Sequence, residues 1–280
     1  MKTRFLSLLL LPAALLTSPA RADEAAHGPF GNNSLITGMR GNLYDLKNTP
    51  ERELTDVAPN GGVNSDECYE AIEDLAKKGF RQKDLDEYRI GDTSCDMKYL
   101  SFGITGADAA PAAFGSPEID PTGIIILYKG VIEEAPQEEI RFAGLFDDAM
   151  LVLVNDKVVF FTAWVEDKTK YKSKEISKQR KARLKGDEGV GMGDAYGDYI
   201  QLRKGDVIQI AIAEIPGGHI GGALKVQVKG KTYETDKFGD PILPPFVVGE
   251  LTENEKNALG NSGTQFNMND IPVFKFAIGE

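Results

Sequence analysis

Apolar and polar side chains alternate along much of the chain beyond the first hundred residues, a pattern that predicts β-strands. Positions 224, 226 and 228 are apolar while 225, 227 and 229 are lysine or glutamine, as in a strand with one buried face. Residues 150–154 are apolar throughout, which indicates a strand buried on both faces. Asn155-Asp156 follows, and because both residues tolerate a left-handed backbone, they predict a two-residue turn into a strand at 157–161. Further strands are expected at 99–104, 124–131, 139–146, 199–203 and 207–214.

Helical periodicity is confined to one convincing segment, at about 66–78. Asn64 has a glutamate three positions later, which is a capping pattern, and Gly79 follows two lysines as a stop signal. Strands without helices between them argue against a parallel α/β sheet. The expected fold is therefore all-β, an antiparallel β-sandwich or barrel with this helix as an insertion. A C-terminal tail, 250–280, should add a short helix capped by Thr252 and an edge strand at 272–276.

The N-terminus has the order of a secretory signal peptide. Lys2 and Arg4 precede an apolar run at 5–16, and Ala20-Arg21-Ala22 follows it. The run is too short to span a bilayer of about 30 Å. We expect cleavage after Ala22, export to the periplasm or the extracellular space, and no membrane span. The expected organisation is a signal peptide (1–22), a loose N-terminus (23–37), the sandwich domain (38–249) and the tail (250–280).

Charge and cysteine content narrow the function classes. The 280 residues include 32 Lys+Arg and 43 Asp+Glu, a net charge of −11, and loss of the signal peptide makes it −14 because that segment carries three basic residues and no acid. So acidic a chain is not expected to bind nucleic acid. Two histidines leave little material for a zinc site. In an oxidising compartment Cys68 and Cys95 are candidates for a disulfide, with two free thiols as the open alternative.

No motif for catalysis is present, which predicts that the chain is not an enzyme. The glycine-rich stretch 189–193 neither follows an expected strand nor opens a helix, and His219 stands alone in a glycine-rich loop. The sharpest local feature is Asp147-Asp148, between two apolar strands. Adjacent carboxylates at a sheet edge either hold a cation such as calcium or form a turn in which they accept hydrogen bonds from local backbone N–H groups.

These residues carry a resemblance to a known family. The stretch from Gly144 through Asp147-Asp148, the apolar strand and the Asn155-Asp156 turn to Trp164 resembles the signature of the anthrax protective-antigen-type (fourteen-kilodalton fragment) β-sandwich domain. Segments 41–47, 107–115, 128–130 and 240–244 resemble a narrower group of exported bacterial paralogues of unknown role, so the likeness covers most of 38–246. The resemblance implies a β-sandwich whose members occur in toxins, glycosidases and adhesins, so it does not fix the function.

The resemblance also implies a site. In sugar-binding members two adjacent aspartates hold calcium, helped by an asparagine and by carbonyl groups of a later loop. Asp147 and Asp148 match that pair, which makes calcium the candidate cofactor. The later loop here, 215–222, has no asparagine, a departure from the family pattern. The candidate ligand-binding residues are Asp147, Asp148, Trp164, Glu214, Gly217, Gly218 and His219.

A basic stretch stands out from the acidic remainder of the chain. It is either a contact for an anionic polymer or envelope surface, or a solvated insertion in a long hairpin. Its residues are Lys168, Lys170, Lys172, Lys174, Lys178, Arg180, Lys181, Arg183 and Lys185. Trp164 and the nearby Phe160 and Phe161 are candidates either for stacking on a sugar or for packing in the core.

Together these features predict an exported, non-catalytic module that binds a carbohydrate or a cell-envelope ligand. Two alternatives stay open at this level. One is a structural or assembly module that docks another envelope protein. The other is a polysaccharide-active enzyme whose site carries no recognisable motif.

Overall fold

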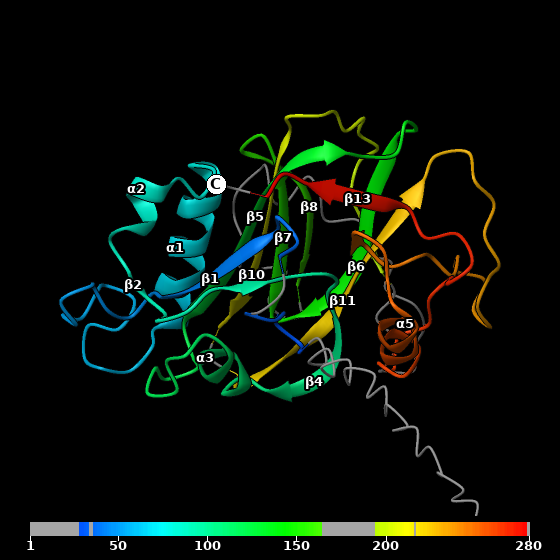
Figure 1. Ribbon diagram of the computed structural model, residues 1–280. Helices are drawn as coiled ribbons and strands as arrows, with labels where there is room; N and C mark the ends of the chain where they lie inside the picture. The colour runs from blue at the N-terminus through cyan, green and yellow to red at the C-terminus, as the bar shows by residue number, and fades with distance from the viewer. Residues whose placement is uncertain (1–27, 34–35, 164–193, 216, 279–280) are drawn as a thin grey trace, which may run out of the picture.

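The computed structural model describes residues 28–33, 36–163, 194–215 and 217–278 (Figure 1). The expected signal peptide, Trp164 and the basic stretch 168–185 lie outside these ranges. Across the described residues, every helix is too short or too polar to cross a bilayer.

Two sheets form the body of the molecule. The larger contains β12 (Val247–Val248), β13 (Val273–Phe276), β5 (Ile124–Glu134), β10 (Val207–Glu214), β7 (Ala149–Val154) and β8 (Lys157–Ala163), in that order. Strand β1 (Arg40–Asp45) also pairs with β5, and with the short β2 (Arg89–Ile90) and β3 (Cys95–Asp96). The smaller sheet has the order β4 (Ser101–Gly106), β11 (His219–Val228), β6 (Ile140–Asp147) and β9 (Ala195–Tyr196). Neighbouring strands run antiparallel apart from β12 and β13, so the expected all-β sandwich is confirmed.

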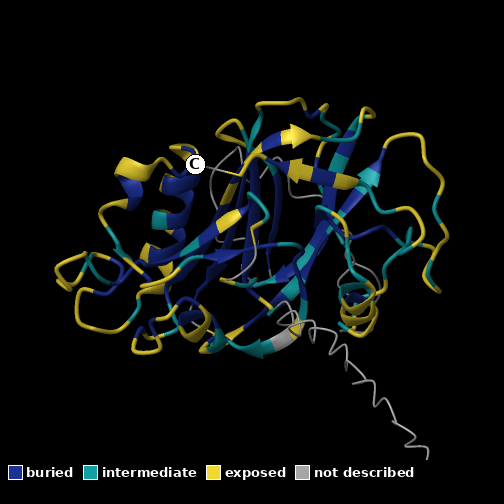
Figure 2. Cartoon of the chain, viewed as in Figure 1, coloured by how far each residue is buried: buried dark blue, intermediate teal, exposed yellow. Residues whose placement is uncertain are grey.

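Two apolar cores lie on opposite faces of the larger sheet. Ile208, Ile210 and Ile212 of β10 point into the core between the sheets. The alternate residues Ala211 and Ala213 face a second core, which helix α1 (Ser65–Lys77) covers. Figure 2 shows the central strands buried and the loops and outer helix faces exposed. Burial on both faces explains why the sequence of β7 is an unbroken apolar run.

The predicted helix and hairpin are both confirmed. The Asn64 side chain caps α1 by accepting a hydrogen bond from the Asp66 N–H at 3.1 Å. Strands β7 and β8 pair through Asn155 and Asp156, whose φ angles are 49° and 63°. Three shorter helices are also present among the described residues: α2 (Gln82–Leu85), α3 (Ala109–Ala113) and α5 (Glu253–Gly260).

The C-terminal tail packs against the sandwich. Thr252 and Glu255 form a capping box at the start of α5, as the sequence predicts. Strand β13 pairs antiparallel with β5, so it joins the larger sheet. Leu259 of α5 is buried with Tyr99 and Val247 in a small third core.

The strand expected at 199–203 is not formed. Ile200 makes one isolated bridge to Ile140, and the rest of that segment is irregular. Strand β11, by contrast, begins at His219 instead of residue 224, so part of the glycine-rich loop is sheet. Gly222 allows this close pairing, because a Cβ at that position would lie 2.2 Å from the carbonyl oxygen of Leu145.

The predicted disulfide between Cys68 and Cys95 is wrong. Both cysteines are buried and free. Cys68 lies in the core beneath α1, whereas Cys95 lies in the core between the sheets. The larger sheet separates the two cores, and neither the spacing of the cysteines nor the compartment reveals which core each side chain enters.

Candidate functional site

The adjacent aspartates connect the two sheets. Strand β6 of the smaller sheet ends at Asp147, which pairs with Gly221 of β11. Strand β7 of the larger sheet starts one residue after Asp148, and its Ala149 pairs with Ala213 of β10. The peptide bond between the aspartates is cis. The pair therefore lies at one end of the sandwich, beside the loop that joins β10 to β11.

Asp148 is held against that loop. Its side chain is buried, and its Oδ2 accepts a hydrogen bond from the Ile215 N–H at 2.7 Å. The predicted closeness of the aspartates to the later loop is thus confirmed. Burial raises the pKa of the Asp148 carboxyl well above its ordinary value of 3.8, and hydrogen bonding with Asp147 and the nearby Glu214 charge raise it further.

Glu214 is the second buried carboxyl at this end. It ends β10, one position after the Ala213–Ala149 pair, so continuing the register places it opposite Asp148. Its exposed fraction is 0%. The Oε1 atom accepts a hydrogen bond from the Gly218 N–H at 2.8 Å, while Oε2 has no partner among the described residues. Burial raises the pKa of Glu214 to about 7, against the opposing effect of backbone hydrogen bonds.

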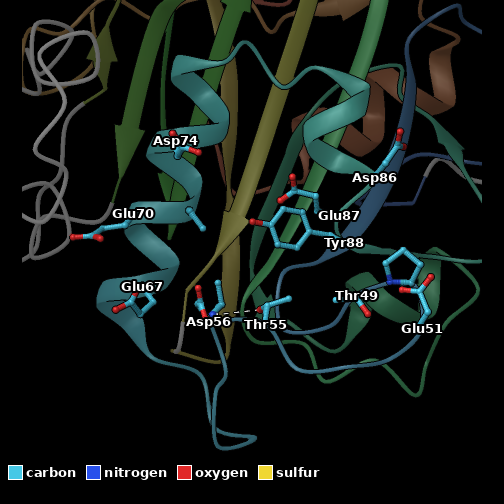
Figure 3. A pocket seen from close by; sticks show the side chains of 13 residues that line it. Thr49, Glu51, Thr55, Asp56, Glu67, Glu70, Asp74, Asp86, Glu87 and Tyr88 are labelled. Atoms are coloured by element: carbon cyan, nitrogen blue, oxygen red, sulfur yellow. Dashed lines mark hydrogen bonds between the residues drawn. The ribbon is translucent and has the colours of Figure 1, made fainter.

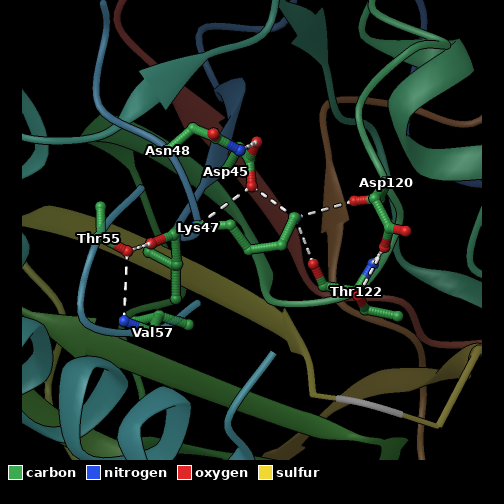
Figure 4. Close-up of polar contacts among 8 residues, drawn as sticks. Asp45, Lys47, Asn48, Thr55, Val57, Asp120 and Thr122 are labelled. Carbon is green, nitrogen blue, oxygen red and sulfur yellow. Dashed lines mark hydrogen bonds and ion pairs between the residues drawn. The ribbon is translucent and has the colours of Figure 1, made fainter. Parts of the chain in front are cut away.

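Lys47, the nearest buried cation, is already bonded to other groups (Figure 4). The Lys47 ammonium is ion-paired with Asp45 Oδ1 at 2.5 Å and donates hydrogen bonds to the carbonyl oxygens of Asp120 and Thr122. Its charge lowers the pKa of Glu214, but no ion pair joins a basic side chain to Asp148 or Glu214 within the described part of the chain. Two like-charged side chains opposite each other in a sheet are destabilising, which favours the protonated form of these carboxyls.

The loop above the carboxyls is accessible. Gly217 and His219 are exposed and Gly218 is half-buried. A Cβ at Gly217 would lie 3.6 Å from Asp148 Oδ1, so the loop backbone passes directly beside that carboxylate. His219 Nδ1 lies 3.1 Å from the Gly217 carbonyl oxygen, within the loop.

Of the predicted site residues, the structure brings together Asp147, Asp148, Glu214, Gly217 and Gly218, with His219 at the margin. Trp164 and the basic stretch fall outside the described residues. Phe160 and Phe161 are 0% and 1% exposed, so they pack in the core and do not present rings to a sugar.

The oxygen-rich donor set fits a hard cation such as calcium, which takes carboxylate and carbonyl oxygens. The unpartnered Glu214 Oε2 and the buried Asp148 carboxylate are such donors. Among the described residues, however, no three or more His, Cys, Asp or Glu side chains converge as in a preformed metal site.

A separate hollow of about 710 Å³ lies between α1 and the loops that contain residues 49–57 and 86–88 (Figure 3). Sequence reasoning missed it, although three acids spaced along one face of the predicted helix were a signal. Its lining includes seven carboxylates and no basic side chain: Glu51, Asp56, Glu67, Glu70, Asp74, Asp86 and Glu87.

Comparison with known proteins finds no matching family model and no matching curated protein. Among solved structures, the chain is similar to a PA14 sugar-binding domain from an RTX adhesin, at 13% identity and a TM-score of 0.40, over 71% of this chain and 94% of that one. It is also similar to the A domain of epithelial adhesin 6 from Candida glabrata, solved with Galβ1-3GlcNAc, at 11% identity and a TM-score of 0.37, over 75% and 95%. A third similar structure is an anti-sigma factor domain-containing protein from Clostridium clariflavum, at 10% identity and a TM-score of 0.37, over 81% and 51%. These similarities are too distant to transfer a ligand to this chain.

Proposed function

We propose that the chain is an exported, non-catalytic binding module whose ligand is a carbohydrate of the cell envelope or its surroundings. The ligand docks at the end of the sandwich formed by Asp147, Asp148 and the loop 215–219. One observation carries this proposal: two buried carboxyls lie side by side beneath an exposed glycine-rich loop, and Glu214 Oε2 has no partner among the described residues. Buried polar atoms are normally bonded. Thr162 Oγ1 and Gln209 Oε1 are also unbonded among the described residues, but Glu214 Oε2 is the ionisable atom of the three and lies beneath an exposed loop, which supports a cation there.

Calcium is the proposed cofactor of this site, in line with the family resemblance. Asp147 and Asp148 would hold it, together with carbonyl groups of the loop that follows Glu214. When bound, calcium would neutralise the carboxylates and offer open coordination positions to sugar hydroxyl groups.

Binding fits the geometry better than hydrolysis does. Glycosidases of the usual kind place two carboxyl groups on either side of a glycosidic bond, in contact with the substrate. Here Glu214 is fully buried under the loop, and Asp148 Oδ2 is bonded to the Ile215 N–H. Neither carboxyl faces an open cleft in which a sugar bond could lie between them.

The test combines calcium titration with glycan binding. We expect millimolar calcium to raise the melting temperature of the wild-type chain, because an ion that binds only the folded state stabilises it. Asp148→Asn should abolish that rise and the calcium-dependent binding on a glycan array, with little loss of stability in chelator, since the amide oxygen still accepts the Ile215 hydrogen bond. Asp156→Asn, the same change at the other end of β7, should leave both responses intact.

Two results would contradict the proposal. Calcium that neither shifts the melting temperature nor releases heat in calorimetry would remove the metal site. Turnover of a polysaccharide that Asp148→Asn abolishes would show that the carboxyls do chemistry instead of binding.

A further inference from the structure

Arg141 lies on the outer face of the smaller sheet, and its guanidinium group is held in one orientation. Arg141 of β6 points away from the inter-sheet core, whereas its neighbours Ile140 and Phe142 point into it. Its Nε–H donates a hydrogen bond to Gln227 Oε1 at 2.7 Å, and Gln227 is its partner across the sheet on β11. The guanidinium carbon lies 4.4 Å from the Tyr196 ring centroid and 4.8 Å from that of Tyr199.

These contacts fix the guanidinium without neutralising it. Within the described ranges Arg141 forms no ion pair, and its hydrogen bond uses Nε alone. The two terminal nitrogens are left with a planar fork of N–H donors, which matches a carboxylate in a bidentate manner. Stacking on two tyrosine rings holds that fork in place before a ligand arrives, so less side-chain entropy is lost on binding.

Two lysines lie beside Gln227 in a row along this face. Lys225 lies on β11 two residues before Gln227, so the two face the same side. Lys229 is the first residue after β11, and its ammonium group lies over the Tyr199 ring. Their ammonium groups are paired with Asp194 and Glu139 and also lie 5.8 Å from the Phe266 ring and 5.7 Å from the Tyr199 ring. The row is about 13 Å long at the rise of a strand. Because both ammonium groups are already ion-paired, Arg141 is the cation of this row that a carboxylate can bind without displacing a partner.

We infer that this surface, Arg141 with Tyr196, Tyr199, Gln227, Lys225 and Lys229, is a binding face for an acidic polysaccharide that carries uronate carboxylates. One carboxylate pairs with the Arg141 fork, and neighbouring carboxylates compete for the two lysines. A sugar polymer is favoured over an acidic peptide because the partly exposed tyrosine rings beside the cations offer flat surfaces to pyranose rings.

This face is distinct from the carboxyl pair. Arg141 and Asp147 lie on the same strand, six residues and about 20 Å apart. The inference does not depend on calcium or on the proposed function, and each can fail without the other.

The test measures binding of polygalacturonate oligomers by calorimetry in the presence of a chelator, so that the Asp147–Asp148 site plays no part. Arg141→Gln should weaken binding about tenfold or more, as expected for loss of a charge-assisted bidentate contact. Arg141→Lys should recover only part of the affinity, because lysine keeps the charge but lacks the fork. The matched control is Arg203→Gln, an exposed arginine in the loop before β10, which should bind as the wild type does.

Several outcomes would overturn the inference. One is a wild-type protein that does not bind polygalacturonate in chelator. Another is an equal loss of affinity in Arg141→Gln and Arg203→Gln. Full affinity of Arg141→Lys would show that general charge, not the oriented fork, is responsible. Polyglutamate binding as tightly as polygalacturonate would exclude a face built for a sugar polymer. Melting temperatures of the variants, unchanged from wild type, would establish that Arg141→Gln acts on binding and not on folding.

Discussion

Strand β7 has an aspartate-containing turn at each end, and the two turns differ in the partners of their buried polar side chains. At the hairpin end, Asn155 Oδ1 accepts a hydrogen bond from the Val207 N–H at 2.9 Å, and its amide donates to Asp206 at 2.8 Å. Asp156 Oδ1 accepts from the buried Gln209 Nε2 at 2.8 Å, whereas Gln209 Oε1 has no partner among the described residues. At the opposite end, Asp148 and Glu214 are both buried, and one oxygen of Glu214 is bonded to nothing in the described structure.

The two ends differ in charge. Polar side chains at the hairpin end bond the backbone and the neighbouring strand, and the unpartnered atom there, Gln209 Oε1, belongs to an uncharged amide. At the carboxyl end, burial works against ionisation of Asp148 and Glu214, which is a cost to the folded chain at neutral pH unless a proton or cation binds. Residues that look alike in sequence thus lie in different electrostatic environments at the two ends of a single strand.

A large effect on the pH dependence of stability should come from removing the charge of Glu214. Because its pKa rises from 4.5 to about 7 on folding, the folded chain holds a proton that the unfolded chain releases. Stability should therefore fall as the pH rises from 4.5 through about 7, by on the order of 3 kcal/mol from this group. Glu214→Gln should remove that part of the pH dependence, as measured by urea unfolding in chelator below pH 4.5 and above pH 7.

Its control is Glu253→Gln, at an exposed position in the first turn of α5, which should leave the pH profile unchanged. The comparison between the two ends of β7 would be wrong if Glu214→Gln and Glu253→Gln had the same profile. Asp148→Asn should flatten the profile over a wider range, from its ordinary value of 3.8 upwards, because the pKa of that carboxyl is also raised.

A smaller effect is expected at the hairpin end. Asp156→Ala removes the acceptor of Gln209 Nε2, a side chain that is 0% exposed, and also places alanine at a φ of 63°. Loss of the hydrogen bond and the left-handed backbone together should cost about 2 kcal/mol. Asp156→Asn keeps both the acceptor and the tolerance for this backbone, so urea unfolding should find it close to wild type. A destabilisation by Asp156→Asn as large as that by Asp156→Ala would contradict this account.

Local sequence could predict β7, its hairpin and the position of Asp147-Asp148, because each depends on residues within a few positions. The apolar run fixes a doubly buried strand, and Asn155-Asp156 fixes the turn. The burial of Glu214 could not be predicted in this way, since it depends on the register between β10 and β7, strands that lie more than fifty residues apart. From the sequence alone, a charged residue at the end of a strand is expected to be exposed.

The orientation of Arg141 was missed for the same reason. Its alternation within 139–146 predicts an outward side chain, but Tyr196, Tyr199 and Gln227 come from segments that only the tertiary fold brings together. The cysteine prediction failed because export and an even cysteine count say nothing about which face of a sheet each thiol occupies. The tertiary fold decides which strands pair and which of the two cores a side chain enters.

The smallest expected effect concerns the thiol beneath the carboxyl end. Burial raises the pKa of Cys68 to about 12, and the charges of Glu214 and Asp148 add to that rise. Since the thiolate is the reactive form, Cys68 should react far more slowly with a thiol reagent in the native protein than after unfolding. Reductant should leave the melting temperature unchanged, because no bridge joins the two cores.

If the carboxyl end opens more readily than the hairpin end, native-state labelling of Cys68 should be slow but faster in chelator than in calcium, measured by mass spectrometry. Equal labelling under both conditions would show that the carboxyl end is as rigid as the hairpin end, and a melting temperature that falls with reductant would restore the disulfide.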